Sequence, residues 1–301
     1  MYGIDRKTPP AGAGESKKHI QAISDALSHR NPGFLPRGEL FITQPFLDRF
    51  FADLRGSYPR QLNAAVRAMG LSLVGLDLNE GASMLLPSLG EAGELEDRFI
   101  AGYINGPVSR LIESHGFVDA MKSMRKEPAL FSETTGNLLR FIENGAKAAR
   151  KHGLMAIALA DDIAGNKGLL FSPDYFKNTV WPAYREIGEI IKGNGLSAFF
   201  HSDGDIRKII ELLLQAGYDC IHPVDGQGGL DLYALQKEFG ERVSFMGHID
   251  VMAWDADRIA SEIDRAEKVF DKGGLILGSM GGISMDVKPE ALRALYPGLE
   301  E

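Results

Sequence analysis

Eight short apolar segments alternate along the chain with longer segments of helical period, and most of the apolar segments end at Gly, Asp, Asn or His. This alternation is typical of strand–helix units that build a parallel sheet. A doubly wound open sheet uses the same units, but eight units of similar size favour closure. We therefore predict an α/β fold, a (β/α)8 TIM barrel. The expected strands are residues 39–43, 71–77, 98–105, 155–161, 197–203, 220–225, 243–250 and 275–279.

A helical extension is expected before the barrel. Ile20, Ile23 and Leu27 lie on one face of a predicted helix, which ends at the turn sequence 31–33. Residues 1–33 are thus interpreted as a flexible lead-in and an N-terminal helix, and residues 34–301 as the barrel. The stretch 106–153 exceeds the length of one barrel helix, so it predicts an inserted helical element.

Composition limits the classes of function. Hydrophobic residues make up 44% and charged residues 25%, which indicates an ordinary globular protein with a large core. A net charge of −8 without a basic block disfavours binding to nucleic acid or to an anionic membrane. The single cysteine, Cys220, excludes an internal disulfide. We expect a cytoplasmic protein that acts on a small molecule.

Polar residues gather directly after the predicted strands, where barrel enzymes place their active sites. Three of the seven histidines and many carboxylates are in this set, but few basic residues are. Crowded carboxylates repel one another, and a bound cation relieves the repulsion. The predicted catalytic residues are His201, Asp162 and Asp77, the predicted substrate-binding residues are Asn79, Asn105, His222, His248, Asp250 and Met280, and the predicted metal ligands are His201 and Asp203.

The His-x-Asp sequence at 201–203 is the strongest metal candidate. Side chains two residues apart on a strand face the same side, and imidazole with carboxylate suits zinc, manganese or iron. Of these, zinc is the preferred ion. Two alternatives stay open: His201 acts without a metal, or Asp203 caps the next helix and His201 is structural. Asp161 and Asp162 face opposite ways as strand neighbours, and we favour Asp162 as the one in the site.

Several segments together resemble the uroporphyrinogen decarboxylase superfamily, whose fold is a (β/α)8 barrel. They are PRGEL at 36–40, LADDIAGNKGLLFSPDYF at 159–176, FFHSDGDI at 199–206, MGHID at 246–250 and the closing GGLILGS with DVKPE. The resemblance covers nearly the whole chain. It implies either decarboxylation of uroporphyrinogen or methyl transfer involving corrinoid proteins or thiols.

The sequence departs from both branches of that superfamily. The Arg-Gln-Ala-Gly-Arg motif with which true decarboxylases grip substrate carboxylates is absent, although Asp77 corresponds to their pyrrole-binding aspartate. Thiol methyltransferases bind zinc through His-x-Cys and a later cysteine. Here His201 matches, Asp203 replaces the first cysteine, and Gly281 or Gly282 stands near the second. The site would be harder than a thiolate site.

The resemblance and the acidic rim together favour a methyltransferase-like enzyme that passes a methyl group from a small donor to a corrinoid carried by a partner protein. A lyase of the uroporphyrinogen decarboxylase type is the alternative within the enzymes. A non-catalytic barrel that holds a tetrapyrrole or a partner protein is the alternative outside them.

Overall fold

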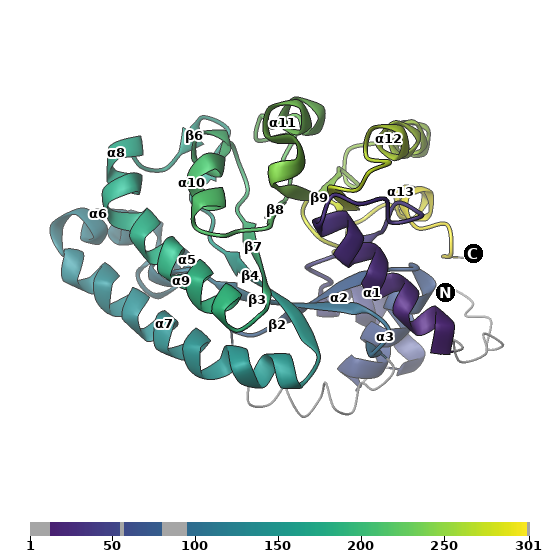
Figure 1. Cartoon of the computed structure of the whole chain (residues 1–301), viewed down its shortest axis with the longest axis horizontal. Helices are drawn as coiled ribbons and strands as arrows, with labels where there is room; N and C mark the ends of the chain where they lie inside the picture. The colour runs from purple at the N-terminus through teal and green to yellow at the C-terminus, as the bar shows by residue number, and fades with distance from the viewer. Residues whose placement is uncertain (1–12, 55–56, 80–94, 300–301) are drawn as a thin grey trace. The chain divides into compact units, whose positions relative to one another are not determined.

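A computed structural model describes residues 13–54, 57–79 and 95–299 (Figure 1). Its main sheet has eight strands in the order β1-β2-β3-β4-β7-β8-β9-β10, so consecutive strands of the sheet are neighbours. Arg37 and Leu277 form a parallel bridge between the first and last strands. The predicted (β/α)8 barrel with an N-terminal helical extension is therefore confirmed. The strands are β1 Gly38–Glu39, β2 Leu73–Asp77, β3 Phe99–Asn105, β4 Leu154–Ala160, β7 Ser197–His201, β8 Cys220–His222, β9 Ser244–Ile249 and β10 Leu275–Ser279.

The described residues group into two compact units. Unit 1 takes its residues from Met1–Leu76, Ser83–Ala101 and Ser244–Glu301, and unit 2 from Asp77–Ala82 and Gly102–Val243. The expected lead-in, residues 1–12, lies outside the described residues, and the division at residue 33 stays a prediction. In the described part of the chain, no helix has both the length and the apolar character needed to cross a membrane.

In unit 1, helix α1 (Ala13–Leu27) lies against the amino ends of strands β9 and β10. Its buried face includes Ile23 and Ala26. The carbonyl of Ala26 accepts hydrogen bonds from Gly274 N at 2.8 Å and from Ser244 Oγ at 3.2 Å. The extension is thus held by both apolar and polar contacts. Among the residues that the structure describes, the other helices of the unit are α2 Gln44–Phe50, α3 Tyr58–Ala68, α12 Ala256–Val269 and α13 Pro289–Leu295, with a 3-10 turn at Ala52–Leu54.

In unit 2, the predicted helical insertion forms three consecutive helices, α5 (Pro107–His115), α6 (Phe117–Lys126) and α7 (Pro128–Lys151). Pro107 and Pro128 stand at the first helical positions, where the missing N–H costs no hydrogen bond. Helix α7 packs against α5, α6 and α9 (Figure 1). The remaining elements are the hairpin β5 Ala164–Gly165 and β6 Gly168–Leu169, α8 Pro173–Tyr175, a π-helical turn Phe176–Val180, α9 Trp181–Gly193, a 3-10 turn Arg207–Ile209, α10 Ile210–Gln215, α11 Leu232–Phe239 and a 3-10 turn Gly240–Arg242.

A buried carboxyl group, Glu39, ties β1 to the end of β10 in unit 1. Its side chain is 1% exposed. Oε1 accepts from Ser279 N at 2.6 Å and from the Tyr296 hydroxyl, and Oε2 accepts from Ser279 Oγ at 2.7 Å. Burial raises the pKa of Glu39 from about 4.5 to about 7, although these three hydrogen bonds lower it.

Glu39→Gln should therefore remove a pH dependence of stability. Between the two pKa values the folded chain binds more protons at Glu39 than the unfolded chain, so stability falls as pH rises through this window. From about pH 5 to about pH 8, the wild type should lose on the order of 2–3 kcal/mol of free energy of unfolding that the variant does not lose. Urea unfolding at both pH values measures this change. Glu267→Gln, at an exposed position of α12, is the control and should track the wild type. Parallel pH profiles of wild type and Glu39→Gln would contradict the assignment.

Candidate functional site

His201 is the last residue of β7, between two partner strands of unit 2. Phe199 and Phe200, which precede it, are fully buried and anchor the strand in the core. The strand register pairs His201 with Ala160 of β4 and with His222 of β8. The backbone N–H of Asp161 then donates to the His201 carbonyl at 2.8 Å. The segment that leaves β4 is thereby held beside the end of β7.

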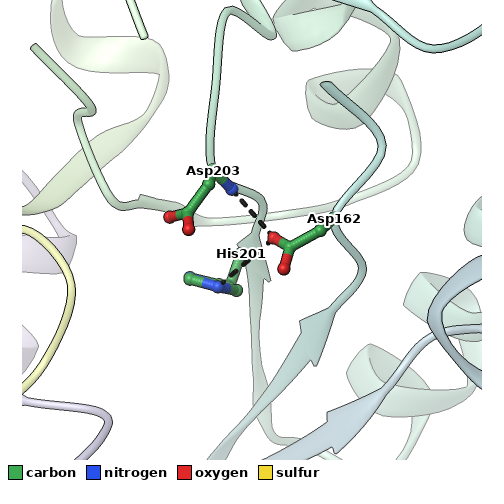
Figure 2. A group of neighbouring side chains, drawn as sticks. All are labelled: Asp162, His201 and Asp203. Carbon is green, nitrogen blue, oxygen red and sulfur yellow. Dashed lines mark hydrogen bonds and ion pairs between the residues drawn. The ribbon is translucent and has the colours of Figure 1, made fainter. Parts of the chain in front are cut away.

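This arrangement brings Asp162 and Asp203 to His201 (Figure 2). Nε2 of His201 lies 3.6 Å from Oδ1 of Asp162, and the same oxygen accepts from Asp203 N at 3.0 Å. One ligand atom from each of the three residues lies within 4.8 Å of the others. Two of the three residues are those predicted as metal ligands, and the third was predicted as catalytic.

The charges at this cluster favour a cation. Burial lowers the pKa of His201 to about 4, although the charge of Asp162 raises it, so the imidazole is neutral near pH 7. Burial and the charges of Asp162 and Asp225 raise the pKa of the Asp203 carboxyl to about 6. A neutral imidazole with repelling carboxylates is the state in which these groups bind a divalent metal.

The donor set fits zinc or another borderline divalent ion. In a tetrahedral site with bonds of about 2.0–2.1 Å, neighbouring ligand atoms lie about 3.3 Å apart. The 3.6 Å between His201 Nε2 and Asp162 Oδ1 is close to this value. If all three residues bound a zinc ion, a fourth position would be left for water or substrate, as in catalytic rather than structural zinc sites.

The loop that carries Asp203 is fixed by Asp225, which follows β8. Its carboxylate accepts from Gly204 N at 2.8 Å and from Gly228 N at 2.7 Å. Gly204 has a φ of +85°, and a Cβ there would lie 2.6 Å from the backbone of Ala164 in β5. Only glycine therefore suits this position. The contacts hold the Asp203 backbone beside Asp162.

Asp161 points away from the cluster and caps a helix. Its carboxylate accepts from Val108 N at 3.1 Å and Ser109 N at 2.5 Å, at the start of α5, and from the Tyr184 hydroxyl at 2.7 Å. Burial raises the pKa of Asp161 to about 6, against the lowering effect of these hydrogen bonds. The hydroxyl of Ser109 in turn accepts from Asp162 N at 3.1 Å. The cap thus helps to position Asp162.

A second polar cluster of unit 2 joins the ends of β2 and β3. Asp77 Oδ1 accepts from the backbone and side-chain nitrogens of Asn79 at 2.8 and 2.9 Å. Asn79 Oδ1 accepts from Asn105 N at 2.7 Å, and Nδ2 of Asn105 donates to Glu113 at 2.5 Å. Arg110 donates to the Asn105 carbonyl at 2.8 Å. Three of the predicted site residues, Asp77, Asn79 and Asn105, therefore form one network.

Three further predicted residues belong to unit 1. His248 has a φ of +93°, its Nε2 lies 3.0 Å from Glu262 of α12, and its ring meets Trp254 edge-on at 5.5 Å. Asp250 accepts from the backbone nitrogens of Met252 and Ala253 at 3.1 and 2.9 Å. Met280 is half-buried, and its N–H donates to Ile249 at 2.8 Å. Their substrate-binding role stays a prediction.

Two contributors to the cluster had no signal in the sequence. Tyr184, in the middle of α9, meets Asp161 from a separation of 23 residues. Ser109 meets Asp162 from a separation of 53 residues. Tyrosine on a helix face and serine near a helix start are common in any protein. Only the folded chain shows that they support the site.

The fold and the cluster define a barrel with a candidate metal centre at the carboxyl ends of its strands. The sequence profile of the uroporphyrinogen decarboxylase (URO-D) family matches residues 96–298, so the chain belongs to this family. Family membership indicates an enzyme. Comparison with curated protein sequences gives no match.

Similar solved structures share the barrel fold. A methyltransferase from Methanosarcina mazei has a TM-score of 0.69 and 16% identity, over 94% of this chain and 97% of that one. A mannanase from Bacillus subtilis has a TM-score of 0.54 and 12% identity, over 97% and 93%. A sugar phosphate isomerase/epimerase from Parabacteroides distasonis has a TM-score of 0.51 and 12% identity, over 88% and 94%. Since fold does not determine function, these likenesses at low identity describe the architecture alone.

Proposed function

We propose that the chain is a methyltransferase of the URO-D family that moves a methyl group from a small donor to a corrinoid carried by a partner protein. His201, Asp203 and Asp162 would hold a divalent metal, zinc by preference, that would assist the transfer. The observation that carries the proposal is the convergence of one neutral imidazole and two carboxylates at the strand ends. The His-x-Asp sequence at 201–203, which resembles the His-x-Cys pattern of the thiol methyltransferases, supports the same branch of the family.

The donor set resembles the zinc site of thiol methyltransferases, but with harder ligands. Aspartate stands at position 203, where that pattern has cysteine, so the ligands are nitrogen and oxygen instead of sulfur. Such a site prefers an oxygen or nitrogen ligand over a soft thiolate. A methylated alcohol, ether or amine therefore suits this chain better than a methylated thiol as the donor.

The residues of the chain have separate tasks in this reaction. A bound divalent ion would act as a Lewis acid on the donor heteroatom. In the transfer, the bond between methyl carbon and heteroatom would break with its electron pair staying on the heteroatom, which takes up a proton, and a Co(I) acceptor would supply the electron pair of the new bond to the methyl carbon. We assign proton delivery to Asp77, because Asp162 and Asp203 would be ligands of the metal. Asp77 is exposed and would take from water the proton that it passes to the heteroatom. Asn79 holds that carboxylate in place through two hydrogen bonds.

Decarboxylation of uroporphyrinogen is the competing function, and the charge of the site disfavours it. The substrate carries eight carboxylates, and each needs a basic partner to bind firmly. A charge-assisted hydrogen bond contributes about 1.5–3 kcal/mol. Asp162, Asp203 and Asp225 instead place three carboxyl groups near one another at the strand ends. The pKa of Asp203 is raised by burial and, in addition, by the charges of Asp162 and Asp225. The arginine-rich motif of true decarboxylases is also absent from the sequence.

An activity assay separates the two functions. Zinc-loaded protein with cob(I)alamin and a panel of methanol, methylamine and methoxybenzene should give the methyl-cobalt spectrum with at least one donor. The same protein with uroporphyrinogen should release no coproporphyrinogen above background. Asp162→Asn removes one negative charge from the proposed metal site and should lower the rate of methyl transfer by about 100-fold.

A different outcome would promote the competing function. Coproporphyrinogen formation that Asp77→Asn abolishes would overturn the methyltransferase assignment. Absence of both reactions, with no zinc bound, would favour the barrel as a non-catalytic binder of a tetrapyrrole or a partner protein.

A further inference from the structure

His201 contacts a second histidine, His222, which is not one of the three candidate metal ligands. The two residues end the neighbouring strands β7 and β8 and are paired in the register. Their Nδ1 atoms lie 2.8 Å apart, with ring centroids at 5.0 Å and planes inclined by 33°. Both side chains are buried, and Ser202 N donates to the His222 carbonyl at 3.1 Å, which fixes the strand ends.

The short distance between the two Nδ1 atoms restricts the ring protons. Two N–H groups facing each other at hydrogen-bond distance would repel, and so would two lone pairs. One Nδ1 must therefore donate and the other must accept. A neutral imidazole carries its single proton on one nitrogen, so the tautomer of either ring sets the tautomer of the other.

The other nitrogen of His201 faces the proposed metal site. Nε2 is the atom that lies 3.6 Å from Asp162 Oδ1, whereas Nδ1 is engaged with His222. A metal ligand must offer a lone pair, so a metal-bound His201 carries no proton on Nε2 and holds it on Nδ1. The proton then lies between the two rings.

We propose that His222 is a positioning residue that accepts the Nδ1 proton of His201 and thereby presents His201 Nε2 to the metal. The proposal rests on the metal site of the proposed function. His222 itself is then in the tautomer with its proton on Nε2. The hydrogen bond also fixes the orientation of the His201 ring relative to Asp162 and Asp203. Outer partners of this kind change metal affinity by about 10–100-fold when they are removed.

Two substitutions separate hydrogen bonding from packing. His222→Leu preserves the approximate size of the side chain but removes the hydrogen-bond acceptor. His222→Asn instead offers an amide oxygen near the place of Nδ1. Affinity for Co2+ and Zn2+, measured on the full chain by competition with a chromophoric chelator, should fall about 10–100-fold in His222→Leu. In His222→Asn it should stay within about fivefold of wild type. Cys220→Ala, at a buried position of the same strand, is the control and should bind as wild type does.

A measurement on the wild type does not depend on the folding of any variant. In zinc-loaded protein labelled with 15N-histidine, the Nδ1 nitrogen of His201 should carry a directly bound, exchange-protected proton. An Nδ1 of His201 without a proton would overturn the proposal, and so would a His222→Leu variant with wild-type metal affinity. If the wild-type protein binds neither Co2+ nor Zn2+, both the proposed metal site and the proposed role of His222 are wrong. Binding that His201→Ala abolishes and His222→Leu leaves unchanged would end this proposal alone.

Discussion

His201→Ala is expected to lower the affinity of the chain for Zn2+ by more than about 100-fold, which is about 2.7 kcal/mol of binding free energy. The imidazole is the one neutral nitrogen donor of the cluster, and the remaining donors are two carboxylates that repel each other. Carboxylates with water prefer magnesium or calcium to zinc. The variant should therefore lose both affinity and preference for zinc. Metal content after dialysis and chelator competition measure both quantities.

His19→Ala is the matched control for this experiment. His19 is also a histidine whose pKa is lowered to about 4 by burial, and its Nδ1 lies 2.9 Å from Ser72 Oγ in unit 1. The pKa of His19 is thus shifted in the same direction as that of His201, but His19 lies outside the cluster. Equal zinc content in the two variants would show that His201 is not a ligand. Zinc retained by His19→Ala and lost by His201→Ala is the expected result.

The barrel could be predicted from the sequence because its strands are apolar on both faces. LSLVGLD and SAFFHSD are each buried along nearly their whole length, so each gives a continuous apolar run that ends at a polar residue. The hairpin of β5 and β6 could not be predicted in this way. It has two residues per strand, Ala164–Gly165 and Gly168–Leu169, and such short segments have no period.

The region after β6 contains a helical feature that likewise could not be predicted from the sequence. The segment from Pro173 to Gly193 is a short α-helical turn, a π-helical turn and then α9. Ser172 caps its start, as the Ser-Pro-Asp sequence predicts. Apolar periodicity does not separate α from π hydrogen bonding over five residues. The change of helix type within the run was therefore not visible in the sequence.

For the candidate site, the sequence could predict which side chains share a strand end but not which way each one turns. His201 and Asp203 are two residues apart, and the structure brings both to Asp162. His248 is the next-to-last residue of β9, but its positive φ and its contact with Glu262 were not visible in the sequence. A histidine at φ +93° is held there by its surroundings, and the sequence carries no sign of them.

Asp161→Ala is expected to destabilise the fold by about 3–5 kcal/mol, the largest effect that we expect from any single buried carboxylate of unit 2. Helix α5 begins at Pro107 after Gly106, which offers no side-chain cap. Asp161 supplies the cap from another strand through Val108 N and Ser109 N, and also accepts from Tyr184. Alanine would leave these three donors, two of them buried and one half-buried, without their acceptor.

The loss of stability in Asp161→Ala can be compared with the loss on replacing a solvent-exposed aspartate that also caps a helix. Asp231 caps α11 through a hydrogen bond from Ala234 N at 2.7 Å, and its side chain is exposed. Water can replace that carboxylate, so Asp231→Ala should cost about 1 kcal/mol. Urea unfolding of both variants at about pH 7.5, where Asp161 is ionised, measures the difference. If Asp161→Ala costs no more than Asp231→Ala, the buried cap contributes nothing beyond an ordinary one. If it costs the larger amount, Ser109 should also lose its hold on Asp162, and zinc affinity should fall with stability.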